Sequence, residues 1–221
     1  MFYGLLQRLA DMTGKSTSLQ EILYGFIMAL IFVNASALGL LNFDDPIQFV
    51  WMVTGMNVTW GAIDAVIFYY LGVCDQNRFA RIIRNSDNRT REERVNDLMD
   101  EFSASPLDIL EPEEQRKICE NILDHKIQTE DESKKDRKAM ALSSLGCFIW
   151  TVLTLIPIVV PVILIDDFRV ALFVALTLSS IILFLVGFYM ARYLGTDRWK
   201  TGLALAVMSW IIAIISTFTG G

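Results

Sequence analysis

The sequence predicts an all-α integral membrane protein with five transmembrane helices and a helical cytosolic insert between the second and third. Of the 44 charged residues, 30 fall within residues 74–138. Five apolar runs lie outside that window, and each is long enough to cross a hydrocarbon core of roughly 30 Å as about 20 helical residues. The runs lack the period-two alternation of barrel strands. A single soluble domain does not separate its charge in this way, so we expect a membrane protein with one polar insert.

The predicted spans divide the chain into three segments. Residues 1–73 hold the first two spans, 74–138 form the insert, and 139–221 hold the last three spans. The five spans are residues 19–41, 47–73, 139–165, 168–194 and 200–219. Residues 2–12 predict a short amphipathic helix on the membrane surface, with a frayed terminus as the alternative. Ser18 followed by Glu21 has the pattern of a capping box at the start of the first span.

Basic residues predict the orientation of the spans. If the N-terminus and the insert share one side of the membrane, 18 of the 19 lysines and arginines lie on that side, and only Arg169 lies on the other. Basic connections stay in the cytosol, so the N-terminus and insert are expected to be cytosolic and the C-terminus outside. Pro157 and Pro161 are expected to kink the third span, because each removes a backbone hydrogen bond.

The insert is expected to contain two helices. The first runs from about 90 to 102 behind a capping box formed by Thr90 and Glu93. The second starts at Glu111 and Pro112 and ends near Lys126. Residues 128–138 are expected to extend the third span.

Acidic side chains gather on these two helices at helical spacing and predict a divalent-cation site, because hard cations bind several carboxylate oxygens. The candidate metal ligands are Glu93, Asp97, Asp100, Glu101, Glu113, Glu114 and Glu120. The alternative is an ordinary solvated face, since arginines and a lysine interleave with the acids.

Polar residues inside the spans predict a transport path. Asp64 is an acid deep in the second span, and a carboxylate there is a functional-site hypothesis by default. No lysine or arginine lies in the middle of any span to neutralise Asp64. Met28 lies at matching depth in the first span, and Asn34 and Asn57 add neutral oxygens. The alternative is a protonated Asp64 bonded to a neighbouring hydroxyl or carbonyl.

Composition argues against several other classes. The three cysteines show no CxxC spacing, which excludes a cysteine zinc site or a disulfide scaffold. A net charge of −6 leaves no electrostatic footprint for nucleic acid. No nucleophile–base pair is visible, so we do not expect an enzyme.

The ordered set of motifs resembles the vacuolar iron transporter (VIT1/CCC1-like) family. Three segments carry the likeness: Gln20–Gly25 (QEILYG), Leu155–Pro161 (LIPIVVP), and the connection that contains Gly187, Arg192–Gly195 and Lys200–Gly202. The chain looks like a divergent member. The family's Asn-Asp-Gly in span 1 aligns with Met28, Ala29 and Leu30, so the metal-binding Asp is missing. Its span-2 Met and Glu are missing as well, and Asp64 supplies a carboxylate there instead.

The resemblance implies a homodimer in which two Asp64 and two Met28 face a shared axis. It also implies proton-driven export of a divalent cation such as Fe²⁺ or Mn²⁺ from the cytosol. The cation is then a substrate, and no tightly bound cofactor is expected. The expected partners are the lipid bilayer, divalent cations and protons, in a multi-pass protein of the cell membrane or an organelle membrane. The alternative is a non-transporting scaffold or sensor whose insert binds a partner or a cation.

Overall fold

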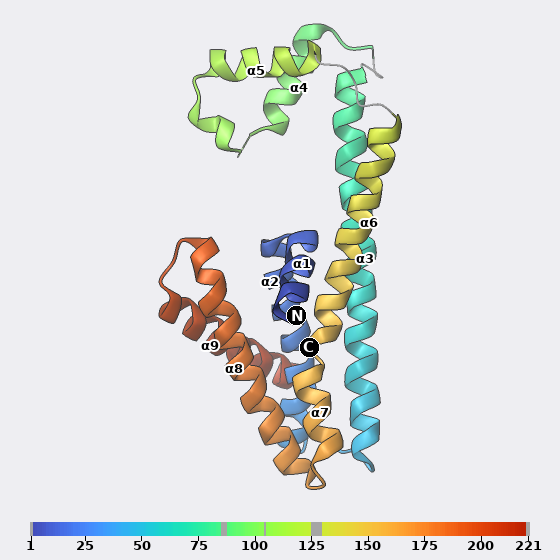
Figure 1. Cartoon of the computed structure of the whole chain (residues 1–221), viewed down its shortest axis with the longest axis vertical. Coiled ribbons are helices and arrows are strands. Elements are labelled where there is room, and N and C mark those ends of the chain that lie inside the picture. The colour runs from blue at the N-terminus through green and yellow to red at the C-terminus, as the bar shows by residue number, and fades with distance from the viewer. Residues whose placement is uncertain (1, 85–87, 104, 125–129, 220–221) are drawn as a thin grey trace. The chain divides into compact units, whose positions relative to one another are not determined.

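The computed structural model describes residues 2–84, 88–103, 105–124 and 130–219, and the regular structure within these ranges is entirely helical (Figure 1). The elements in chain order are α1 (Phe2–Thr13), α2 (Lys15–Ala37), α3 (Pro46–Arg84), α4 (Arg91–Glu101), the short 3₁₀ helix η1 (Pro106–Ile109), α5 (Pro112–Asp124), α6 (Glu130–Leu153), α7 (Ile156–Leu164), α8 (Phe168–Leu194) and α9 (Arg198–Thr219). Five segments of the described chain are long and apolar enough to cross a membrane: Lys15–Ala37, Pro46–Ile83, Lys134–Leu164, Phe168–Leu194 and Arg198–Thr219. The predicted helical class and the number of spans are confirmed.

Two helices extend beyond the predicted spans. Helix α2 begins at Lys15, before the predicted start of the first span at residue 19, because Gly14 adopts φ 91° and separates α1 from α2. Only glycine adopts this conformation without strain. Ser18 therefore lies inside α2, where its hydroxyl donates to the Gly14 carbonyl at 2.8 Å, and it does not form the predicted capping box with Glu21. Helix α3 likewise continues to Arg84, past residue 73 where the second span is predicted to end, and the bounds of the membrane-spanning part stay a prediction.

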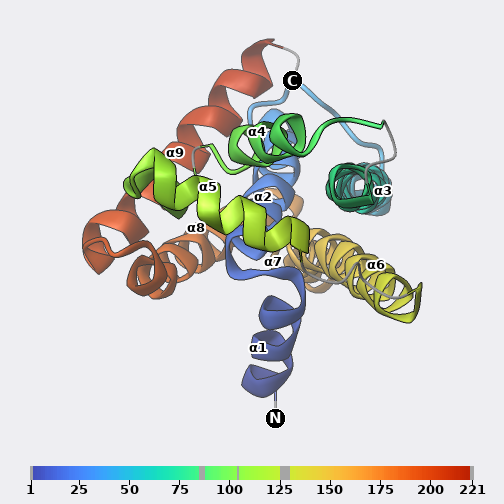
Figure 2. The same ribbon diagram turned by 90° about the horizontal axis from the view of Figure 1, so that it is seen from above.

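The chain divides into two compact units. We call Met1–Ile67 with Leu142–Gly221 the membrane unit, and Phe68–Ala141 the insert unit. In the membrane unit, α8 and α9 lie side by side in both views (Figures 1 and 2).

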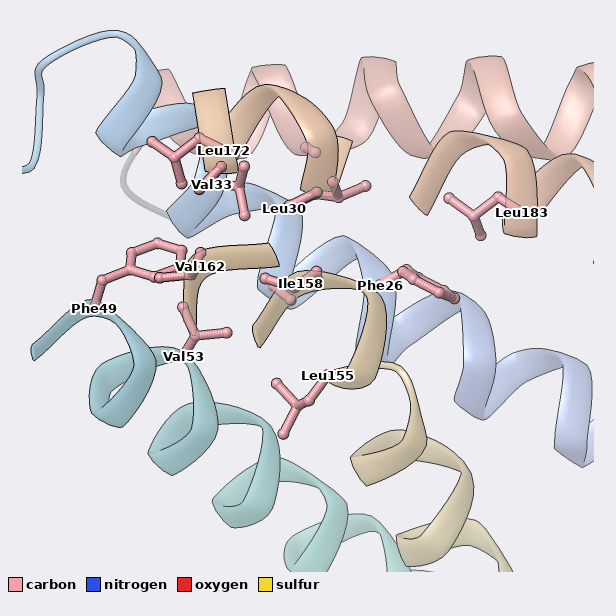
Figure 3. Close-up of a cluster of buried hydrophobic side chains, with 14 of the residues drawn as sticks. Phe26, Leu30, Val33, Phe49, Val53, Leu155, Ile158, Val162, Leu172 and Leu183 are labelled. Atoms are coloured by element: carbon pink, nitrogen blue, oxygen red, sulfur yellow. The ribbon is translucent and has the colours of Figure 1, made fainter. Parts of the chain in front are cut away.

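The core of the membrane unit lies where α2, α3, α7 and α8 meet (Figure 3). The labelled side chains in that view are Phe26, Leu30, Val33, Phe49, Val53, Leu155, Ile158, Val162, Leu172 and Leu183. Phe49 meets Phe43 and Phe168 edge to face, each with ring centroids 5.5 Å apart. Large apolar side chains such as Trp51 and Phe173 remain exposed on the outside of the bundle, where lipid is the natural solvent.

The third span is broken between α6 and α7. Pro157 lies in the first turn of α7, and Pro161 lies inside it. Neither proline can donate the backbone bond that a continuous helix requires. The Thr154 hydroxyl donates to the Thr151 carbonyl at 2.7 Å, so one carbonyl at the break is satisfied by a side chain.

Asn57 ties this break to two other helices. Its Nδ2 donates to the Gly25 carbonyl of α2 at 3.0 Å and to Thr154 Oγ1 at 3.3 Å. Gly25 permits the contact, because a β-carbon there would lie 3.1 Å from the Thr151 carbonyl oxygen. Asn57 is fully buried on α3 and thus joins three spans at one point.

Asn57→Leu is expected to lower the free energy of unfolding by about 1 kcal/mol, because both hydrogen bonds are lost at nearly constant volume. Thermal unfolding in detergent is the measurement. Asn34→Leu is the matched control: Asn34 is also buried, but its Nδ2 has no acceptor, so this change should not destabilise the protein. An equal loss of stability in the two variants would contradict the stabilising role of the Asn57 hydrogen bonds.

In the insert unit, the two predicted helices are present as α4 and α5. Thr90 caps α4, and its backbone N–H donates to the Glu93 carboxylate at 2.8 Å, which confirms the predicted capping box. The backbone N–H and the hydroxyl of Thr90 both donate to the Glu93 carboxylate, and these bonds lower the pKa of Glu93 because they stabilise its charged form. Val95 and Leu98 of α4 pack with Cys119 of α5 in a small core of their own. The predicted end of the second helix near Lys126 lies outside the described residues; α5 ends at Asp124.

Candidate functional site

A cavity of about 740 Å³ opens between α2, α3 and α9 of the membrane unit. Its walls are mainly apolar, with Ile27 and Ile31 from α2 and Trp60 from α3. Ser216 and Thr217 bring hydroxyl groups from α9. The volume lies in the usual range of ligand pockets, roughly 300–1,000 Å³.

Met28 and Asp64 both line this cavity. Each is half-buried, and they come from α2 and α3 respectively. A thioether and a carboxylate thus meet at one apolar-walled space inside the spans. Carboxylate oxygens suit hard cations, and a sulfur ligand shifts preference toward softer transition metals. Met56 of α3 also lines the cavity and adds a second thioether.

Glu21 is a functional candidate that the sequence analysis missed. Its side chain is fully buried, although Glu21 is only the seventh residue of α2. Thr151 Oγ1 donates to Glu21 Oε2 at 2.8 Å, and Glu21 Oε1 has no hydrogen-bond partner among the described residues. Neither Glu21 nor Asp64 forms an ion pair within the described part of the chain.

The two asparagines lie elsewhere. Neither Asn34 nor Asn57 is among the residues that line the cavity. Asn57 is engaged in the three-helix junction described above, and Asn34 is buried in α2. Their expected part in moving an ion onward stays a prediction.

Three of the predicted metal ligands in the insert unit form ion pairs with arginines. Arg89 pairs with Asp97, Arg78 with Glu101, and Arg116 with Glu120 at 3.3 Å. Glu93 is used in the capping box, and Glu113 and Glu114 lie exposed in the first turn of α5. Asp100 lines a cavity of about 280 Å³ together with Asp97, Glu101 and four arginines: Arg78, Arg81, Arg89 and Arg94.

Among the residues that the structure describes, no group of three or more His, Cys, Asp or Glu side chains is arranged to hold a metal ion. The arginine pairs favour the solvated-face alternative for the insert, because a paired carboxylate must lose its partner before it can bind a cation. Metal binding by this face stays a prediction.

Comparison with known proteins adds one finding. A family model described as the VIT family matches residues 19–221, which is nearly the whole chain. No curated protein and no solved structure matches it.

Proposed function

Because the chain belongs to the VIT family, whose members are metal ion transporters rather than enzymes, we propose that it carries a divalent cation of the Fe²⁺ or Mn²⁺ kind across the membrane. The observation that carries this proposal is the cavity between α2, α3 and α9, which Met28 of α2 and Asp64 of α3 both line. The set of chemical groups suits such an ion, since it combines a hard oxygen and a soft sulfur.

Charge balance supports exchange of the metal for protons. Burial in an apolar environment favours the neutral form of a carboxyl group. Asp64 has no ion-pair partner within the described residues, so a proton or a metal ion must supply the positive charge. A divalent cation that reaches the cavity displaces a proton, and its release lets a proton return.

The proposed direction is export from the cytosol, with the N-terminus and insert on the cytosolic side. The segregation of basic residues supports this orientation. The proposed assembly is a homodimer. The apolar face of α3, which includes exposed Trp51, Met52, Ile63 and Val66, is available to a second copy or to lipid.

Met28→Leu is expected to reduce selectivity more than rate, because leucine keeps the volume of methionine and removes its sulfur. In proteoliposomes, the ratio of Fe²⁺ uptake to Mg²⁺ uptake should fall. Met52→Leu is the control, since Met52 is exposed on α3 and does not line the cavity. An unchanged ratio in Met28→Leu would remove the thioether from the proposed site.

The second candidate function is a non-transporting scaffold or sensor. The observation that favours it is the pairing of insert carboxylates with arginines, which resembles a solvated interaction surface more than a metal site. Absence of any divalent flux by the wild-type protein would support this candidate.

A further inference from the structure

A second large cavity lies in the membrane unit, away from the one that holds Asp64. It has a volume of about 680 Å³ and is bounded by α1, α2, α6, α8 and the start of α9. Its floor is apolar, with Ile22, Ile182 and Val186 among the lining side chains. Trp150 also lines it, and its buried indole N–H has no acceptor in the part of the chain that the structure describes.

The mouth of this cavity is basic. Lys15, Arg192 and Arg198 line it, whereas Asp11 is the one acidic side chain among the lining residues. Lys15 lies over the Tyr193 ring at 4.1 Å, and Arg198 lies 5.9 Å from the Phe188 ring. None of the three cations forms an ion pair within the described residues. Three cations and one carboxylate leave an excess of positive charge.

The backbone adds to this positive field. The N-terminus of α2 lies at the mouth, with Lys15 as its first residue, and no side chain caps it. The free N–H groups of its first turn are donors for an anion there. The amphipathic helix α1 contributes Leu6 and Gln7 to the same wall. A basic rim above an apolar floor thus lies at the surface of a membrane-spanning bundle.

We propose that this cavity binds one anionic phospholipid, with its phosphate group held by Lys15, Arg192 and Arg198 and an acyl chain against the apolar floor. A zwitterionic lipid has no net charge to balance the positive charge of the mouth. A soluble phosphate has no apolar part to cover the apolar floor. Basic pockets between transmembrane helices are suited to anionic headgroups. The site is separate from the proposed metal path, so lipid binding can be tested independently of metal transport.

Native mass spectrometry of the full-length protein, titrated with phosphatidylglycerol, tests the proposal. Arg192→Gln should weaken binding about fivefold, as expected for one cation near an anionic lipid. The triple variant Lys15→Gln/Arg192→Gln/Arg198→Gln should weaken it by more than about tenfold. Leu185→Trp, which fills the cavity without changing charge, should also weaken it, because Leu185 lines the cavity and is partly exposed.

Lys200→Gln is the matched control, since Lys200 is an exposed base near Arg198 that does not line the cavity. Binding should be unchanged in this variant. Phosphatidylcholine should bind more weakly than phosphatidylglycerol, and glycerol 1-phosphate should not compete at matched concentration. Equal phosphatidylglycerol binding by the wild type and Arg192→Gln, or full competition by glycerol 1-phosphate, would overturn the proposal. The Arg192 side chain is exposed and forms no hydrogen bond or ion pair within the described residues, so Arg192→Gln should fold and test the proposal even if the triple variant does not fold.

Discussion

Asp64→Asn is expected to reduce metal flux by at least about tenfold while leaving the protein folded. Asparagine keeps the shape of the side chain but carries no negative charge and cannot exchange a proton. Loss of a residue that merely orients a metal ligand typically costs 10–100-fold in affinity, so loss of the charged ligand should cost at least about tenfold in uptake. Divalent-ion uptake into proteoliposomes is the measurement. Thermal stability should be unchanged or higher, because a half-buried carboxylate without an ion-pair partner is removed.

Asp44→Asn provides the control for this experiment. Asp44 is exposed in the connection before α3 and does not line the cavity. Its replacement makes the same change in net charge and should leave uptake unaltered. Wild-type rates in Asp64→Asn, with both variants equally well folded, would exclude Asp64 from the transport path.

Gly187→Val is expected to disrupt the pairing of α8 with α9. A β-carbon at Gly187 would lie 2.8 Å from the Gly202 Cα atom and 2.9 Å from the Thr201 carbonyl oxygen. Both obstacles are backbone, so neither can rotate away, and the helices must separate. Small residues allow this kind of close approach between membrane helices. The free energy of unfolding should fall by about 3 kcal/mol, at the upper end of typical overpacking costs.

Gly55→Val tests whether the effect comes from the contact rather than from loss of a helical glycine. Gly55 lies in α3, and a β-carbon there meets nothing within 4 Å. Thermal unfolding of the two variants should show a large loss for Gly187→Val and little change for Gly55→Val. Similar behaviour of the two variants would contradict the close packing of α8 on α9.

The spans were predictable from sequence because hydropathy and helical length are local properties. The same holds for α4, whose capping box is formed by residues three apart, Thr90 and Glu93. Counting residues along two antiparallel spans also predicts matching depth for Met28 and Asp64. Depth does not determine which way a side chain faces, however. Asn57 illustrates this, because it points into a junction with Gly25 and Thr154 instead of lining the cavity.

Glu21 was missed for a related reason. Near the polar end of an apolar run, a glutamate three residues after a serine matches a local capping pattern. Its burial depends on Thr151, which is 130 residues away in sequence. No local pattern contains that contact. Pro157 and Pro161 indicate the break in the third span, but the contact of Asn57 with Thr154 at that break joins residues far apart in sequence and is not visible in any local pattern.

The most direct test of the proposed function is Mn²⁺ entry into liposomes that contain the wild-type protein and a metal-quenched dye, measured with and without an imposed pH gradient. If the protein transports metal, quenching should exceed that of empty liposomes. Quenching should be faster when the interior is acidic, because outgoing protons exchange for incoming metal. Quenching equal to that of empty liposomes for both Mn²⁺ and Fe²⁺, at every gradient, would contradict transport and leave the scaffold function in its place.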